Sequence, residues 1–167
     1  MTVREIRLMG DPVLGHRSRE VTSFDGALAV QVADMFDTMY HAGGVGLAAN
    51  QIGLTNRVFV YDTTRTHGMK GVLINPVWTP LSEDTQTGSE GCLSIPGVRG
   101  QVERYQSVSA TGLDLEGRPV SIVAHGWTAR CIQHETDHLN GTLYLDRLPK
   151  EQRQALMAEI HAMTWFK

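Results

Sequence analysis

Apolar residues recur every three or four positions in three segments of the chain, which is the pattern of amphipathic helices. The first segment follows Asp25, a residue type that favours the start of a helix. The second runs from Trp127 to Leu139 and is followed by Asn140-Gly141, a typical helix stop. The third, Lys150–Trp165, has one apolar stripe between charged positions. The apolar positions of the first predicted helix are Leu28, Val32, Met35, Phe36 and Met39.

Short segments rich in β-branched and aromatic residues lie between the first and second helices and predict strands. Arg57–Tyr61 and Val72–Asn75 flank a polar loop, Asp62–Lys70. We expect Pro76 to end the second strand, because proline has no N–H to donate to a sheet. The polar stretch Thr79–Ser89 is rich in turn-forming residues and is expected to be a loop.

Two further segments, Ser107–Leu113 and Val120–Ala124, flank the turn signal Glu116-Gly117 and predict an antiparallel hairpin. Three glycines within Gly43–Gly46 disfavour helix, so we expect a flexible backbone there that other chains can approach closely. Strands in the middle, with one helix before them and two after, favour an α+β fold. We expect antiparallel sheets packed around the Trp127–Leu139 helix, with an N-terminal and a C-terminal helix.

Composition narrows the class of protein. The chain has 167 residues, of which 41% are apolar and 20% charged, which suits one globular domain spanning 1–167. A net charge of −3 disfavours a nucleic-acid substrate or an anionic membrane surface as partner. Its apolar stretches are far shorter than the roughly 20 residues that a membrane-spanning helix needs. Two cysteines are too few for a disulfide framework, and no basic, apolar leader precedes Gly10, so we expect a reducing cytoplasm.

The second predicted helix contains the pattern H-E-x-x-H at His134–His138. On a helix, its two histidines lie one turn apart, about 6 Å along the axis, so both imidazoles can bind one metal ion. Glu135 lies next to a ligand and can reach water at the metal without binding the metal itself, which suits a general base. Such a short pattern also occurs by chance on solvated helices, so further ligands are needed.

Two cysteines are candidates for the third ligand. Cys92 follows Gly91, where the backbone can approach closely, and a cation would stabilise its thiolate. Together with Cys131 and the two histidines, Cys92 would make a closed structural site. However, Cys131 precedes His138 by seven residues, about 10 Å of helix, so Cys131 is expected in a pocket or in the core near the metal. A site of three ligands leaves a position open for water, which is typical of catalysis.

The segment Gly44–Gln51 reads G-V-G-L-A-A-N-Q, and its small residues allow another chain to lie against the backbone. Gln51 adds an amide donor. A nucleotide-binding loop is disfavoured, because the segment follows a helix and lacks the Lys-Ser/Thr pair of a phosphate loop.

Three motifs in this order resemble the signatures of peptide deformylases, and the resemblance extends over nearly the whole chain. They are G-x-G-L-A-A-x-Q at Gly44–Gln51, E-G-C-L-S at Glu90–Ser94 and Q-H-E-x-D-H at Gln133–His138. The resemblance implies a hydrolase that removes the formyl group from the N-terminal methionine of newly made polypeptides. It also implies a divalent metal ion, commonly Fe²⁺ and sometimes Zn²⁺, Ni²⁺ or Co²⁺, and in some relatives a transient ribosome contact by the C-terminal segment.

The resemblance also assigns roles to individual residues. Cys92, His134 and His138 would hold the metal, and Glu135 would act as the acid and base. Gln51 and the backbone N–H of Leu93 would stabilise the oxyanion. The substrate would contact Val45, Gly46, Gly91, Arg99, Trp127 and Cys131, and its methionine pocket would be walled by Val45, Leu93, Trp127, Cys131 and His134.

Two positions depart from the family pattern. Asn50 replaces the usual proline before Gln51, so we expect a looser backbone at that point. Arg130 stands where some members have an aliphatic pocket residue, so we expect a more polar pocket rim.

Two other functions share part of this pattern. A zincin-type endopeptidase has H-E-x-x-H but usually takes its third ligand, a histidine or glutamate, downstream. A metal-stabilised binding domain without activity would need neither Glu135 nor Gln51. Release of formate from a formyl-Met peptide distinguishes all three functions.

Overall fold

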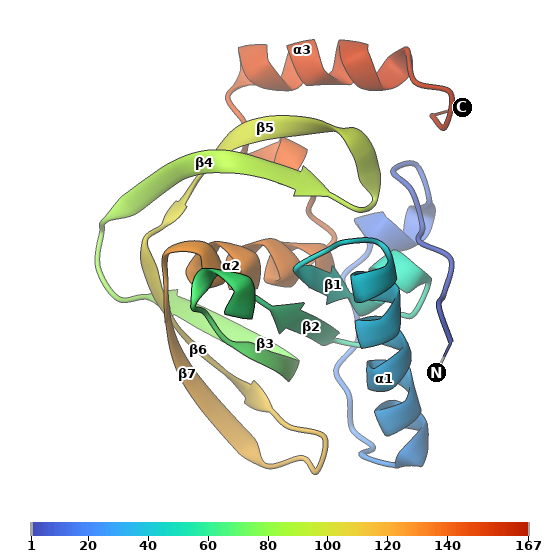
Figure 1. The fold of residues 1–167 in the computed structure, drawn as a ribbon, viewed down its shortest axis with the longest axis vertical. Coiled ribbons are helices and arrows are strands. Elements are labelled where there is room, and N and C mark those ends of the chain that lie inside the picture. Colours follow the sequence, from blue (N-terminus) through green and yellow to red (C-terminus); the bar gives the residue numbers. More distant parts are fainter. Residues whose placement is uncertain (1, 167) are drawn as a thin grey trace.

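A central helix packed between two antiparallel sheets forms the core of the protein (Figure 1). The structure is a computed structural model that describes residues 2–166. The central helix is α2 (Gly126–Leu139), and the larger sheet has five strands in the order β1-β2-β3-β6-β7. The predicted α+β fold is thereby confirmed. The strands of the larger sheet are β1 (Gly46–Ala48), β2 (Val58–Asp62), β3 (Lys70–Pro80), β6 (Ser107–Leu113) and β7 (Pro119–His125), and those of the smaller sheet are β4 (Thr85–Cys92) and β5 (Ile95–Tyr105).

The alternation of side chains along β2 separates two apolar cores. Phe59 and Tyr61 lie in the core that includes α2, whereas Val58 and Val60 lie in the core formed with α1 (Gly26–His41). Successive residues of a strand point to opposite faces, so a strand made only of apolar residues can serve both cores. The predicted stripe of α1 packs on the second core through Leu28, Val32, Met35 and Met39, with Phe36 partly buried beside them.

The helices begin and end close to where the sequence predicts. Asp25 accepts a hydrogen bond from the backbone N–H of Leu28 at 3.1 Å, and Gly141 follows α2 with a φ of +76°. The third helix, α3 (Lys150–His161), ends before the predicted Trp165, whose indole instead donates to the carbonyl of Pro96 at 3.2 Å. Among residues 2–166, no helix combines the length and the apolar character needed to cross a bilayer.

The prediction that Pro76 ends a strand is wrong. β3 continues to Pro80, with a shift of register between Ile74 and Val77. Asn75 adopts a φ of +52° at this irregularity, and its side chain forms two hydrogen bonds with the backbone of Val21, at 2.8 and 2.9 Å. A bulge leaves the extra residue outside the ladder, so the missing N–H of proline costs no sheet hydrogen bond.

The prediction that Thr79–Ser89 is a loop is also wrong, because most of this segment lies in strands. β4 begins at Thr85 and pairs with β5, a long strand that the sequence pattern does not predict. The two-stranded sheet exposes many of its side chains, so polar residues fit it and give no apolar alternation in the sequence.

The glycine-rich segment Gly43–Gly46 forms a turn after α1 that leads into the sheet, and Gly46 is its one residue in a strand. β1 pairs with β2 from Gly46 to Ala48, and a 3₁₀ turn, Ala49–Ile52, follows it directly. All seven residues of β1 and this turn are buried. This packing holds Gln51 at a fixed position beside α2.

Candidate functional site

Two elements bring three candidate metal ligands together. Cys92 ends β4, and His134 and His138 lie one turn apart on α2. Their ligand atoms all lie within 4.8 Å of one another, and Cys92 Sγ is 3.2 Å from His138 Nε2. Cys131 is not part of this cluster, and its thiol instead contacts the carbonyl of Val45 at 3.6 Å. One sulfur and two imidazole nitrogens are a donor set that suits a divalent transition metal.

Cys92 is held at a tight turn between β4 and β5. The turn consists of Leu93 and Ser94, and Cys92 is the strand partner of Ile95. Two N–H donors approach the sulfur, one from the backbone of Ser94 at 3.4 Å and one from the Gln51 amide at 3.5 Å. These contacts hold the sulfur beside the Gln51 amide.

A buried carboxylate orients His134. The Nδ1 of His134 donates to Glu90 at 2.8 Å, which leaves Nε2 free for a metal. Burial alone would raise the pKa of Glu90, but the hydrogen bonds from His134 and Arg104 outweigh it and hold this pKa well below its usual value. Glu90 is therefore charged, and it keeps the imidazole of His134 in one orientation.

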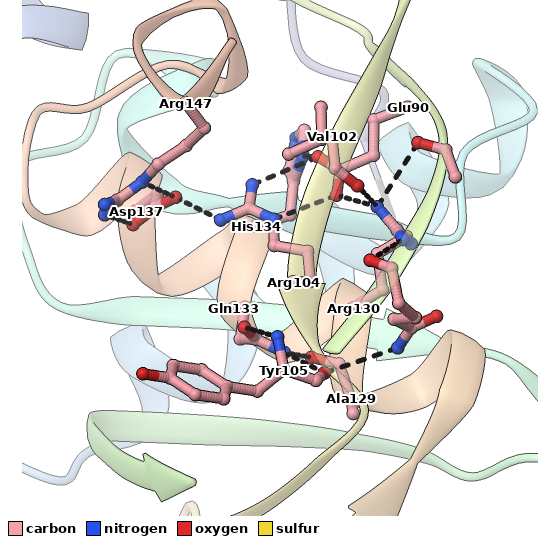
Figure 2. A network of polar contacts seen from close by, with 12 residues as sticks. Glu90, Val102, Arg104, Tyr105, Ala129, Arg130, Gln133, His134, Asp137 and Arg147 are labelled. Atoms are coloured by element: carbon pink, nitrogen blue, oxygen red, sulfur yellow. Dashed lines mark hydrogen bonds and ion pairs between the residues drawn. The ribbon is translucent and has the colours of Figure 1, made fainter. Parts of the chain in front are cut away.

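The network around Glu90 extends along α2 (Figure 2). Arg104, on β5, donates to Glu90 at 2.9 Å and to Asp137 at 2.6 Å, and Arg147 donates to the same Asp137 at 2.7 Å. The buried ion pairs of Arg104 fix β5 against the helix that carries both histidines. In the sequence, Glu90 stands out only as part of a motif, and no signal marks Arg104, which lies outside all three motifs.

Arg130 belongs to this network, contrary to the expected polar rim. Although it lines part of the cavity, its side chain is only 4% exposed. Its guanidinium donates to Glu90 at 2.8 Å and to the carbonyl of Val102 at 2.9 Å (Figure 2). These hydrogen bonds direct the guanidinium to acceptors within the protein, although Arg130 still lines part of the cavity.

Glu135 lies beside the candidate metal ligands, and one of its carboxyl oxygens is not engaged in a hydrogen bond within residues 2–166. This oxygen, Oε2, is buried. Burial, helped by the negative charges of Glu90 and Asp137, raises the pKa of Glu135 to about 7, against the opposing charges of His134 and Arg104. A carboxyl with such a pKa can accept and release a proton near neutral pH.

The Gln51 side chain is oriented by its neighbours. Its Oε1 accepts from the backbone N–H of Ala48 at 2.9 Å, and its Nε2 donates to the hydroxyl of Ser94 at 3.1 Å. The amide N–H₂ therefore points toward the Cys92 turn. Ser94, which is fully buried, is a further site residue that the sequence marks only as the end of a motif.

Asn50, for which the sequence predicts a looser backbone, makes a side-chain contact that a proline could not make. Its side chain is buried, and its Nδ2 donates to the carbonyl of His138 at 2.5 Å. The residue in place of proline thus adds a contact between the 3₁₀ turn and the end of α2.

A cavity of about 540 Å³ opens onto this cluster. β1 is the edge strand of its sheet, so an extended peptide can lie along it. Arg99 reaches across the opposite wall and donates to the hydroxyl of Ser89 at 2.9 Å, and Trp127 is partly exposed. His138 is buried and is not among the lining residues. The cavity is lined by the other predicted site residues, Val45, Gly46, Gln51, Gly91, Cys92, Leu93, Arg99, Trp127, Cys131, His134 and Glu135.

Comparison with known proteins gives one consistent result. Residues 3–154 match the family model described as polypeptide deformylase. The chain is 58% identical to peptide deformylase 1 of Corynebacterium glutamicum over 167 residues, which is 99% of each chain. Among solved structures, the peptide deformylase of Thermus thermophilus is 43% identical with a TM-score of 0.88, over 96% of this chain and 94% of that one. The peptide deformylase of Synechococcus elongatus, solved in complex with actinonin, is 38% identical with a TM-score of 0.89, over 97% and 90% of the two chains.

Proposed function

This chain belongs to the peptide deformylase family, and we propose that its 540 Å³ cavity is where the N-formyl group is removed from the N-terminal methionine of newly made polypeptides. The observation that carries this proposal is the placement of Glu135 and Gln51 beside the cluster of Cys92, His134 and His138. A metal-holding site alone would need neither the Glu135 carboxyl, whose Oε2 has no partner within residues 2–166, nor the oriented amide of Gln51.

The enzyme is metal-dependent, and we propose that Cys92, His134 and His138 hold one divalent ion. We propose Fe²⁺ as the resident ion, with Zn²⁺, Ni²⁺ or Co²⁺ as substitutes that accept the same sulfur and nitrogen donors. A bound divalent ion supplies Lewis acidity, which makes water easier to deprotonate and polarises a carbonyl. Metal analysis of protein purified without oxygen tests the choice of ion.

Glu135 carries the proton in the proposed reaction. As water adds to the formyl carbon, its oxygen forms the new C–O bond and one of its protons moves to the Glu135 carboxylate. The amide N–H₂ of Gln51 and the backbone N–H of Leu93 face the developing oxyanion, each donor being worth about 3 kcal/mol when it is pre-aimed in a dry site. Glu135 then gives its proton to the leaving nitrogen as the C–N bond breaks. The products are formate and a free methionyl amino group.

The walls of the cavity suit an extended peptide with a flexible apolar side chain. The substrate backbone lies along β1, near Val45 and Gly46, with Gly91 and Arg99 on the opposite wall. The methionine side chain enters the space between Val45, Leu93 and Cys131, next to Trp127 and His134. A thioether adapts to a pocket of this kind, which has apolar and sulfur-containing walls.

We also propose the setting in which the enzyme works. Residues 1–167 form one catalytic domain in a reducing cytoplasm, as the charge and cysteine content favour. α3 makes a transient contact with the ribosome, with its apolar residues Leu156 and Ile160 packed inward and its charged residues exposed.

Formyl-Met-Ala is expected to be hydrolysed at least about 100-fold more efficiently than acetyl-Met-Ala. The added methyl of acetyl would occupy the space beside Leu93 and Gln51, and a displacement of about 1 Å at the reacting atoms can cost a factor near 10². Formyl-Ala-Ala loses only apolar burial, about 2 kcal/mol or roughly 30-fold. kcat/KM for the three peptides tests this order. Efficient cleavage of the acetyl peptide, or of an internal peptide bond, would contradict the proposed function.

Gly46→Ala is expected to lower kcat/KM by about 100-fold or more. A Cβ at this position would collide with the Glu135 carboxyl and would lie 2.9 Å from the Cys131 sulfur. Glu135 or β1 must then shift, and misplaced catalytic groups are costly. Gly15→Ala is the matched control, because a Cβ there meets nothing within 4 Å. Equal activity of the two variants would show that Glu135 does not work in its observed position.

A further inference from the structure

The side chain of Asn50 connects two parts of the site that lie far apart in the sequence. Asn50 precedes Gln51 in the 3₁₀ turn Ala49–Ile52, and its side chain is buried. Its Nδ2 donates to the backbone carbonyl of His138 at 2.5 Å, across 88 residues of sequence. Its Oδ1 is also buried and finds no hydrogen-bond partner in the described part of the chain. The hydrogen bond to His138 is therefore the polar contact that this buried amide makes through its side chain.

The acceptor of this hydrogen bond lies at the end of α2, where helix carbonyls lack partners within the helix. The carbonyl of His138 also accepts from the N–H of Gly141 at 3.0 Å, so it stays satisfied without Asn50. The next carbonyl, that of Leu139, accepts from Arg57 at 3.0 Å and from the backbone of Ser18. Of these donors, Asn50 is the one that belongs to the turn carrying Gln51. Asn50 therefore connects the turn to the helix, and it is not needed to cap the helix end.

The connection joins the proposed oxyanion donor to the proposed metal ligands. Gln51 is held by the backbone of Ala48, at the end of β1, and by Ser94 on the Cys92 turn, at 2.9 and 3.1 Å. Neither contact links the turn to α2, which carries His134, Glu135 and His138. The Asn50 hydrogen bond supplies that link one residue away from the catalytic amide.

We propose that Asn50 is a positioning residue that sets where the Gln51 amide stands relative to the ligands on α2, an inference that rests on the proposed function of Gln51. Without this hydrogen bond the turn can move against the helix, and the Gln51 amide no longer meets the developing oxyanion in line. Removal of a residue that orients a functional group typically costs about 10- to 100-fold. Because the ligand side chains belong to α2 and β4, we expect metal binding to be retained without Asn50.

The test is a double-mutant cycle between Asn50→Ala and Gln51→Ala, with formyl-Met-Ala as substrate. Asn50→Ala is expected to lower kcat by about 10- to 100-fold in the otherwise unchanged protein, with KM altered by less than about threefold. In the Gln51→Ala background the same change is expected to lower kcat by less than about threefold, because residues that act through one another are not additive. Full additivity of the two changes would overturn the proposal.

Two further variants separate positioning from stability. Asn50→Leu fills the same volume without a donor and is expected to match Asn50→Ala in kcat, with thermal unfolding reporting whether each variant is folded. Arg57→Met removes a donor from the neighbouring carbonyl at the same helix end but not from the Gln51 turn, so its kcat is expected to stay within about threefold. An equal loss of kcat in Arg57→Met would assign the effect to the helix end and overturn the proposal.

Two measurements do not depend on turnover. The affinity of metal-free protein for Co²⁺ is expected to stay within about threefold in Asn50→Ala, and a fall of more than about tenfold would show that Asn50 supports the ligands instead. The ¹⁵N–¹H signals of the Gln51 side-chain amide are expected to shift in Asn50→Ala and not in Arg57→Met. An unchanged Gln51 signal in Asn50→Ala would overturn the proposal. Failure of the wild-type protein to release formate would instead refute the proposed function itself.

Discussion

Replacing Cys92, His134 or His138 by alanine is expected to abolish metal binding and deformylation together. The three ligand atoms form one cluster within 4.8 Å, and within residues 2–166 this is the group of metal-binding side chains that the structure brings together. A site with three protein ligands has no spare donor, so the loss of one leaves an incomplete coordination shell. Metal content measured after gel filtration, together with formate release, tests this prediction.

Cys131→Ala is the matched control for Cys92→Ala. Its thiol lies on the same helix as the histidines but contacts the carbonyl of Val45 rather than the cluster. Burial raises the pKa of the Cys131 thiol well above its usual value, which also disfavours the thiolate that a metal needs. We expect Cys131→Ala to keep its metal. Stoichiometric metal in Cys92→Ala, with metal loss in Cys131→Ala, would reverse the assignment of the thiol ligand.

Glu135→Gln is expected to lower kcat for formyl-Met peptides by about 10²- to 10⁴-fold while metal content stays near normal. Glutamine has almost the same shape as glutamate but cannot take a proton from water and return it to the leaving nitrogen. Glu135 is not among the clustered ligand atoms, so its replacement leaves the metal donors in place. Metal analysis and steady-state kinetics on the same preparation test whether the variant keeps its metal while it loses turnover.

The control for this variant is Glu116→Gln, an equivalent change in the exposed turn between β6 and β7. It is expected to leave kcat unchanged. Turnover close to wild type in Glu135→Gln would mean that another group carries the proton. Loss of metal in Glu135→Gln would mean that Glu135 is needed to build the site rather than to use it.

The sequence by itself determined the features that depend on local spacing. Helix α2 and its stop at Asn140-Gly141 follow from apolar periodicity and from glycine chemistry. The same helix geometry places His134 and His138 on one face, because four residues make about one turn. The order of three short motifs was enough to indicate the family, and the α+β class follows from the order of the helices and strands.

The tertiary structure decided whatever depends on partners that are distant in sequence. β4 carries mostly polar side chains, and in β5 the buried Val98 and Val102 are separated by Arg99, Gly100 and Gln101, so the apolar alternation is weak and only the pairing of the two strands identifies them. Similarly, β3 continues past Pro76 because a bulge removes that residue from the hydrogen-bonded ladder.

The residues around the site show the same division between what local sequence predicts and what the fold decides. Spacing alone could suggest Cys92 as a ligand, but only the packing of the β4–β5 turn on α2 places its sulfur 3.2 Å from His138. The sequence did not predict the partners of Arg130 and Asn50, because the role of a buried polar side chain depends on which group it meets in the folded chain. Arg130 donates a hydrogen bond to the carboxylate of Glu90, and Asn50 donates one to the carbonyl of His138. A buried donor must be paired, and which acceptor pairs with it is a property of the folded chain.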